Sequence, residues 1–577
     1  MLWLFTAKWD GRLGSATMGS PEGSPLWQGA WVMCSQKTFA GGRAGRNKPR
    51  RSTQTKTAHS TKGNPTMPSS IIRGKHVVTK ITGPSTAEVI EDGAVFQRDG
   101  EIVEVGPYSE LSRRHHPDEI IGSSDHVVIP GLVNAHHHVG LTPFQLGALD
   151  APLETWIIAR WAMRDVDPYL DTLYCAMQMI ESGITTVMHN HMASRLPPGV
   201  ELFDAASQIV DAYEESGMRV AFSLSDRDQN HLVYEDDERF LATLPSDLAA
   251  DARRQINARP ITLEDYLTAN AELLGRKSTD RTRIFISPHN VHWCSDEMLR
   301  AISDFARRNS TGLHIHLHET IYQKMYGARH WNKTPLAHLQ ELGVLGPEVS
   351  CAHGVWLTEY DIDIMAETGT ALCHNPSSNL RLQSGVAPLN PLLDRGVTVA
   401  LGIDEAGIND DNDILQEMRV AQKIHREPGV ASPAPTSHDI FHMATVNGAK
   451  VTFFDKQVGT LEPGKRADIV LIDTRRINEP YLNPNTDIVD ALVYRGKGLD
   501  VDTVIVDGEV LLRNKVFQRF DKAAVIARFK ESLSQPLSER ELNRGALSRR
   551  ILPHIQNWFE TWPLEAGEPH YTYNLAE

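Results

Sequence analysis

The chain has 577 residues, a formal net charge of −15 and 41% hydrophobic residues, with 25 histidines and five cysteines. The acidic balance argues against a nucleic-acid or membrane partner, and the apolar runs are far shorter than the roughly 18 residues that span a bilayer. The scattered cysteines form neither a disulfide framework nor a zinc CxxC pair, which predicts a cytoplasmic protein.

The first 68 residues differ in composition from the rest. They hold ten basic and two acidic residues, a net charge of +8, so the total of −15 leaves −23 for the remainder. Residues 41–70 are rich in Gly, Ser, Thr, Lys and Pro with little apolar periodicity, which predicts a disordered basic N-terminal extension over 1–68. A transit peptide stays an alternative, as does a mis-assigned start before Met67.

Two β-rich segments flank the centre of the chain. Each contains an expected hairpin with an Asp-Gly turn, at Asp99-Gly100 and at Asp507-Gly508. Asp-Gly between two alternating runs is the strongest short-range hairpin signal. The two segments together predict a small composite β-sandwich domain, built from 69–127 and 455–520.

Between these segments, apolar runs that end in a polar residue alternate with stretches of helical composition. Eight strands are expected, at Val127–His138, Ile184–His191, Arg219–Ser225, Arg283–His289, Gly312–Glu319, Val349–His353, Gly369–Asn375 and Val397–Asp404. Eight strand-plus-helix units predict an α/β fold, a (β/α)8 TIM barrel over 128–454. The remainder, 521–577, is expected to be a helical C-terminal tail.

Polar residues gather at the ends of these strands, where a barrel places its catalytic groups. His136 and His138 are two apart on one strand and face the same side. The fifth strand contains His314-Ile315-His316, and the eighth ends at Asp404. Each histidine alone is more often a buried core residue, but several at separate strand ends indicate a ligand set for Zn²⁺ or Fe²⁺.

The motifs, in this order and spacing, resemble the amidohydrolase superfamily over roughly 71–520. Within it they are most similar to the branch of cytosine deaminases, S-adenosylhomocysteine deaminases and triazine hydrolases. The stretches that carry the resemblance include Pro130–His138 (PGLVNAHHH), Gly183–Val187 (GITTV), Pro288-His289, His316–Thr320 (HLHET), Ala352–Thr358 (AHGVWLT), His374–Leu382 (HNPSSNLRL), Gly402–Asp404 (GID) and Gly459–Asp468.

The resemblance implies one divalent metal ion per chain, with Zn²⁺ favoured and Fe²⁺ open. Its ligands would be His136, His138, His316 and Asp404, which leave one position for water. The fourth strand has no lysine to bridge two metals, which favours a mononuclear site. The implied catalytic residues are Glu319 as proton shuttle, His353 beside the activated water, and Asp404 as ligand and proton acceptor.

Four residues are expected to bind substrate: His289, Gln145, Asp165 and His191. His289 matches a histidine that hydrogen-bonds substrate in related deaminases. Gln145 stands where adenosine-type deaminases have arginine, and Asp165 where they have a glutamate that grips ribose. His191, with His189, either lines the pocket or fills the barrel mouth. These departures weaken a nucleoside assignment.

The resulting prediction is a hydrolase that deaminates a heterocyclic amine, of pterin, purine, pyrimidine or triazine type. Hydrolysis of a cyclic amide, as in imidazolonepropionase-like members, is the alternative. A non-catalytic barrel relative is a third reading, disfavoured because such relatives lose ligands that this chain keeps. The expected partners are the small substrate and water, with no nucleic acid or membrane, and the resemblance implies a homodimer or homotetramer.

Overall fold

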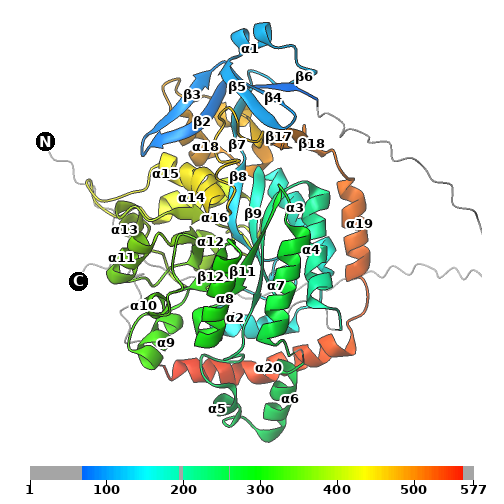
Figure 1. Cartoon of the computed structure of the whole chain (residues 1–577), viewed down its shortest axis with the longest axis vertical. Helices are drawn as coiled ribbons and strands as arrows, with labels where there is room; N and C mark the ends of the chain where they lie inside the picture. The colour runs from blue at the N-terminus through cyan, green and yellow to red at the C-terminus, as the bar shows by residue number, and fades with distance from the viewer. Residues whose placement is uncertain (1–67, 194–198, 259, 563–577) are drawn as a thin grey trace, which may run out of the picture. The chain divides into compact units, whose positions relative to one another are not determined.

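The computed structural model describes residues 68–193, 199–258 and 260–562. The predicted basic extension therefore lies outside the described residues except for Pro68. At the centre, eight parallel strands follow one another around a single sheet (Figure 1). They are β8 (Leu132–His137), β9 (Ile184–Met192), β10 (Arg219–Asp226), β11 (Thr282–Pro288), β12 (Leu313–Leu317), β13 (Val349–His353), β14 (Ala371–His374) and β15 (Val399–Leu401).

The two ends of this sheet meet just after β15. The backbone N–H of Asp404 donates to the carbonyl oxygen of His136 at 2.9 Å, and an isolated parallel bridge joins His137 to Asp404. Because the last strand thus returns to the first, the sheet closes into a barrel. The predicted (β/α)8 fold is confirmed.

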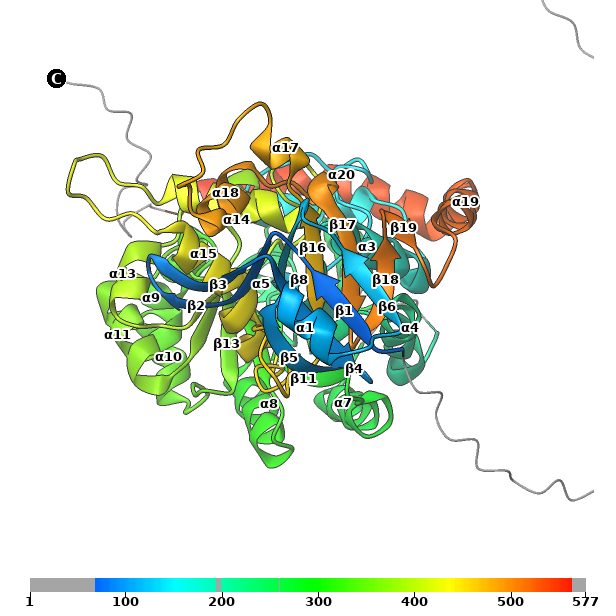
Figure 2. The ribbon, with the colours of Figure 1, turned by 90° about the horizontal axis from the view of Figure 1, so that it is seen from above.

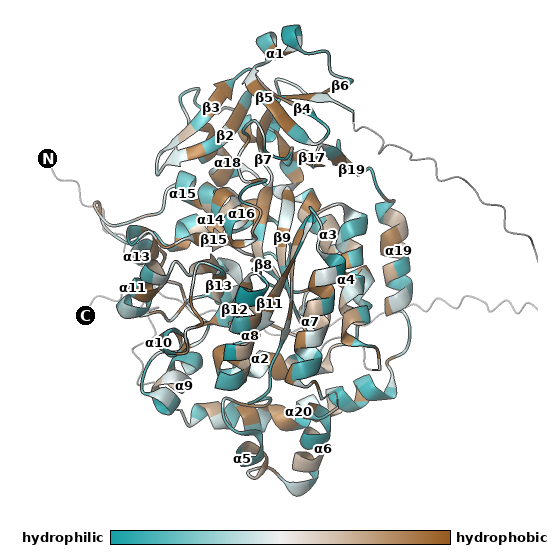
Figure 3. Cartoon of the chain, viewed as in Figure 1, coloured by the Kyte–Doolittle hydropathy of each residue, from teal (hydrophilic) through white to brown (hydrophobic). Residues whose placement is uncertain are grey.

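Helices cover the outside of the barrel because each strand is followed by an amphipathic segment. Local signals set their ends: the Asp167 side chain accepts from Leu170 N–H at the start of α3, and Gly217 ends α4 at φ 85°. The strands they cover are largely buried, as in β9 and β11, and the outer helices α7 and α8 show both hydrophilic and hydrophobic residues (Figure 3). The outer helices include α3 (Pro168–Glu181), α4 (Leu202–Ser216), α7 (Leu263–Lys277), α8 (Asp296–Arg308), α11 (Glu359–Thr368) and α14 (Ile414–Ile424).

The strand expected at Val127–His138 is in fact two strands in two different sheets. The chain leaves β7 (His126–Pro130) at Gly131, whose N–H donates to the Asp468 carbonyl at 2.9 Å, and enters the barrel as β8. A Cβ at position 131 would lie 2.1 Å from the Thr185 hydroxyl oxygen, so only glycine fits there. Hydrophobicity alone did not reveal this break, because both strands are buried.

Strands from both flanks of the barrel share one seven-stranded sheet (Figure 2). The pairing of Ile469 with Pro130 joins the late strand β16 to the early strand β7. This sheet contains, in order, β19 (Val516–Phe517), β18 (Glu509–Arg513), β17 (Val501–Val506), β16 (Ile469–Asp473), β7, β2 (His76–Gly83) and β3 (Thr86–Glu91). A four-stranded sheet contains β5 (Glu101–Pro107), β4 (Gly93–Arg98), β1 (Ser70–Arg73) and β6 (Glu119–Gly122).

The two sheets bury a common apolar cluster that includes Ile72, Val95 and Ile469. Both expected hairpins form, with Asp99 and Asp507 in the left-handed region at φ 54° and 52°. The predicted composite β-sandwich is therefore confirmed as part of the fold, whereas the domain limits stay predictions.

The last described segment forms α19 (Lys522–Leu533) and α20 (Glu539–Glu560), which runs past α2 (Leu153–Ala159) and α6 (Ser246–Ile256) (Figure 1). Because α2 follows β8, α20 lies at the carboxyl ends of the strands. Phe559 of α20, and Trp562 just after the helix, pack with Tyr234 and Tyr322. Within the described part of the chain, no helix combines the length and apolar character needed to cross a membrane.

Candidate metal centre

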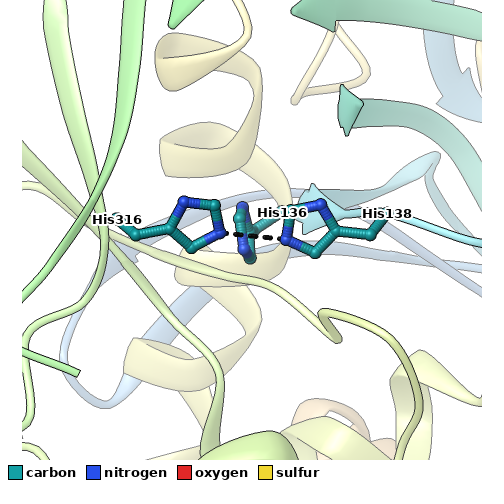
Figure 4. A group of neighbouring side chains, drawn as sticks. All are labelled: His136, His138 and His316. Carbon is teal, nitrogen blue, oxygen red and sulfur yellow. Dashed lines mark hydrogen bonds between the residues drawn. The ribbon is translucent and has the colours of Figure 1, made fainter. Parts of the chain in front are cut away.

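Three buried histidines from two strands point at one another inside the barrel mouth (Figure 4). His136 lies on β8, His138 directly follows that strand, and His316 lies on β12. The Nε2 atoms of His138 and His316 are 3.0 Å apart, and one nitrogen from each of the three residues lies within 4.8 Å of the others. Asp404 Oδ1 is 3.5 Å from His136 Nε2 and 3.3 Å from His138 Nε2.

In His138 and His316, the ring nitrogen that faces away from the centre forms a hydrogen bond with a backbone carbonyl. His138 Nδ1 lies 2.5 Å from the Asn190 carbonyl oxygen, and His316 Nδ1 lies 2.7 Å from that of His289. A carbonyl can only accept, so both Nδ1 atoms carry the proton and both Nε2 lone pairs face the centre.

His136 Nε2 is buried and has no hydrogen-bond partner among the described residues. Burial, with neighbouring histidines as a further cause, lowers the pKa of His136, His138 and His316 well below the usual range. Three neutral imidazoles and a carboxylate, with one orphaned buried nitrogen, fit a divalent metal ion.

Asp404 occupies an unusual backbone conformation at the end of the eighth strand. Its φ of 66° is rare for a residue with a side chain, and His353, at φ 79°, shares this feature at the end of β13. Ser378 donates its hydroxyl to Asp404 Oδ2 at 2.5 Å. Burial raises the pKa of Asp404 to about 7, with Glu405 as a further raising cause. These two turns direct both side chains towards the centre.

Glu319 and His353 lie beside the histidine cluster. His353 Nε2 is 3.9 Å from Glu319 Oε1 and 4.0 Å from Asp404 Oδ2. His353 Nδ1 lies 2.9 Å from Asn379 Oδ1, which orients the ring. Burial, followed by the Glu154 charge, raises the pKa of Glu319 to about 8, so this carboxyl can hold a proton near neutral pH.

One of the four predicted substrate-binding residues borders this group directly. The His289 ring lies 4.7 Å from the His316 ring and stacks at 5.1 Å on Trp293. Its Nδ1 is 2.9 Å from the Ser225 hydroxyl oxygen. A small cavity near Asp404 is lined by Pro143, Asp150, Trp156, Ser378, Arg381, Leu382, Glu405 and Ala406.

The other three predicted substrate residues make their contacts elsewhere. Gln145 is exposed, and its side-chain oxygen accepts from Thr142 N–H at 3.0 Å within its own loop. Asp165 forms ion pairs with Arg540 and Arg544 of α20.

His191 is half-buried at the end of β9, with Nδ1 3.4 Å from His189 Nε2. His189 in turn lies 2.8 Å from the Tyr213 hydroxyl, which belongs to α4 on the outside of the barrel. His191 and His189 therefore form a chain of contacts that connects β9 to α4.

Several residues around the centre carried no assigned role in the sequence. Ser378 and Asn379 belong to the motif His374–Leu382, but the motif alone does not predict their contacts with Asp404 and His353. His314 is two residues before His316, so the period of a strand places both on one face. Glu154, which accepts from Tyr234 at 2.9 Å and from Thr320 at 2.5 Å, has no local signal.

Known proteins agree with this architecture. The model of the Amidohydrolase family matches residues 127–511, so the chain belongs to the amidohydrolase family. The 5'-deoxyadenosine deaminase of Methanothermobacter thermautotrophicus is 35% identical over 445 residues, 75% of this chain and 93% of that protein. The 5-methylthioadenosine/S-adenosylhomocysteine deaminase of Caldanaerobacter subterraneus is 31% identical over 75% of this chain and 92% of that protein.

Two solved structures share the fold. An adenosine deaminase from Xanthomonas campestris with bound zinc has a TM-score of 0.68 at 24% identity, covering 80% of this chain and 97% of its own. An atrazine chlorohydrolase from Arthrobacter aurescens, complexed with zinc, has a TM-score of 0.67 at 21% identity, covering 80% and 100%. The predicted family, branch and class of reaction, hydrolytic deamination by an enzyme, are thereby confirmed.

The names of these relatives also bear on the substrate argument. The departures at Gln145 and Asp165 were expected to weaken a nucleoside assignment, yet the relatives above are named as deaminases of adenosine-type compounds. Two changed positions at the rim therefore do not separate this chain from such deaminases in overall similarity.

Proposed function

We propose that this chain hydrolyses the amino group of an adenosine-type purine at a mononuclear metal centre held by His136, His138, His316 and Asp404. The observation that carries the proposal is the convergence of three imidazoles and a carboxylate beside a second, protonatable carboxyl, that of Glu319. Zinc is the favoured ion because neutral imidazole and carboxylate suit it, although the same donors accept ferrous iron.

When bound, a divalent ion lowers the pKa of a coordinated water to about 7 and so supplies a nucleophile at neutral pH. The chain's own groups handle the protons. Glu319 transfers one to the ring nitrogen of the C=N bond under attack, and Asp404 accepts the other from water. The amino group leaves as ammonia after taking a proton, and the ring carbon keeps the oxygen.

Two groups support this transfer. His353, 3.9 Å from Glu319 and oriented by Asn379, stabilises the charge that develops on the attacking oxygen. His289, stacked on Trp293, offers a flat polar wall to a heterocycle.

The test starts with metal analysis of the purified protein, for which we expect about one zinc or iron per chain. Ammonia release is then measured with 5'-deoxyadenosine, adenosine and 5-methylthioadenosine, against free purines, pterins, pyrimidines and triazines. Release from an adenosine-type compound supports the proposal. Metal-free protein, or turnover restricted to another ring class, would overturn it.

The cyclic-amide reading is separated by its product, because ring opening releases no ammonia. We further propose a cytoplasmic homo-oligomer, a dimer or a tetramer. Light scattering after size-exclusion chromatography tests the assembly, and fractionation of native cells tests the location. A monomeric mass would refute the assembly without affecting the proposed reaction.

A further inference from the structure

One fully buried histidine beneath the metal centre takes no part in the proposed reaction. His314 lies on β12, two residues before His316, with its side chain on the same face. Both of its ring nitrogens are engaged: Nε2 lies 2.7 Å from His136 Nδ1, and Nδ1 lies 2.7 Å from the Ser350 hydroxyl oxygen. Ser350 is opposite His314 in the register of β12 and β13.

The three proposed histidine ligands are not fixed in the same way. Backbone carbonyls hold His138 and His316, and a carbonyl accepts in every circumstance. His136 instead meets another imidazole, which can accept or donate according to its own tautomer. The protonation of His136 Nδ1 is therefore decided by a side chain, not by the backbone.

From this geometry we propose that His314, held by Ser350, is a positioning residue that keeps the proton of His136 on Nδ1 and its Nε2 lone pair free for metal. His314 donates from Nδ1 to Ser350 and accepts at Nε2 from His136. If His314 turned round or were lost, the His136 proton could move to Nε2, the buried atom that has no hydrogen-bond partner among the described residues. The inference rests on the proposed metal centre.

The test compares substitutions of similar size that differ in what they offer His136. His314→Phe fills the space but accepts no hydrogen bond, whereas His314→Gln brings an amide oxygen near the former Nε2. Loss of such an outer partner typically lowers metal affinity about 10- to 100-fold. We expect that loss for His314→Phe, an affinity much closer to wild type for His314→Gln, and a smaller loss for Ser350→Ala.

The readouts are the zinc dissociation constant, by competition with a chelator, and the visible absorption of the Co²⁺-loaded protein, which reports the number of ligands. His338→Phe is the matched control, because His338 is buried against Trp331 and Asp296. It should change thermal stability without changing zinc affinity or the Co²⁺ spectrum.

Equal zinc affinity and identical Co²⁺ spectra for wild type, His314→Phe and His314→Gln would overturn the inference. If the Phe variant does not fold, His314→Asn replaces it, since the shorter amide reaches Ser350 but not His136. Asn and Gln variants with equal affinity would then also overturn it. Wild-type protein that binds no metal at all would instead refute the proposed metal centre.

Discussion

The inner layer of the barrel mouth and its outer rim are built by different parts of the chain. The inner layer consists of residues at the carboxyl ends of the barrel strands that are at most 8% exposed, namely His136, His138, His316, Glu319 and Asp404. The rim is built around α20, which comes from the far end of the chain and lies beyond the residues matched by the family model. The proposed metal ligands thus lie within the family match, whereas α20 lies outside it.

The two regions are nevertheless connected. Phe559 of α20 packs at 5.1 Å against the Tyr234 ring, and the Tyr234 hydroxyl donates to Glu154. Glu154 also accepts from Thr320, the residue that follows Glu319. A chain of contacts therefore runs from a helix outside the family match to the residue next to the proposed proton shuttle. Substitutions in the two regions test how far this connection couples stability to chemistry.

The largest effect is expected inside the inner layer. Glu319→Gln removes the proton carrier while keeping the size of the side chain, and loss of a general acid–base typically costs about 10²- to 10⁴-fold in rate. We expect kcat to fall by that factor while metal content stays at the wild-type value. Steady-state ammonia release and metal analysis of the same preparation give the result.

Glu341→Gln is the control. Glu341 is the last residue of α10 (Pro335–Glu341), and its exposed side chain forms an ion pair with Lys333. This substitution should leave kcat unchanged. Full activity in Glu319→Gln would remove Glu319 from the mechanism.

A large effect on stability is expected at the rim. Phe559 is 4% exposed within the aromatic cluster of α20, and burying such a ring is typically worth about 3–5 kcal/mol in Phe→Ala substitutions. Phe559→Ala should lower the free energy of unfolding by that amount, measured with urea, while zinc affinity stays unchanged. Leu542→Ala, at a position 56% exposed on the same helix, should have little effect. Loss of zinc affinity in Phe559→Ala would show that the two regions are not separable.

A pH-dependent effect is expected next to the inner layer, at Glu417 of α14. Its carboxylate accepts from Ser377 N–H and from the Ser377 hydroxyl, and burial raises its pKa to about 8. Because the folded pKa lies above the unfolded value, this group stabilises the fold fully below about pH 4.5 and loses that contribution as pH rises through about 8.

Glu417→Gln stays neutral at every pH, so its free energy of unfolding should fall less than that of wild type between pH 5 and pH 8. Urea titrations at several pH values on both proteins measure the difference. Parallel curves for the two proteins would mean that Glu417 is charged in the fold.

The smallest effect is expected for Asp165 at the rim. Its side chain is 41% exposed and pairs with Arg540 and Arg544, and exposed ion pairs typically contribute about 0–1 kcal/mol. Asp165→Ala should therefore change stability within that range and leave KM for the best substrate unchanged. A tenfold rise in KM would instead assign Asp165 to substrate binding, as its place in the sequence predicts.

Much of the barrel was predictable because its signals are local. The strand expected at Val349–His353 matches β13 in both bounds, and the one expected at Arg219–Ser225 matches β10 to within one residue. The alternation of His136 and His138 fixed which side chains face inward. The break at Gly131 was missed, since it depends on contacts with Thr185 and Asp468 that are distant in the sequence.

By itself, the sequence determined the barrel, the flanking β-sandwich, the set of histidines and acids at the strand ends, and the family to which they belong. These follow from residue order, because strand period and turn chemistry act over a few residues. Only the tertiary structure decided which group forms a hydrogen bond with each histidine, as His314 does with His136. It also decided that Asp165 forms ion pairs with residues of α20. Such contacts join residues more than 170 positions apart, and no local pattern encodes them.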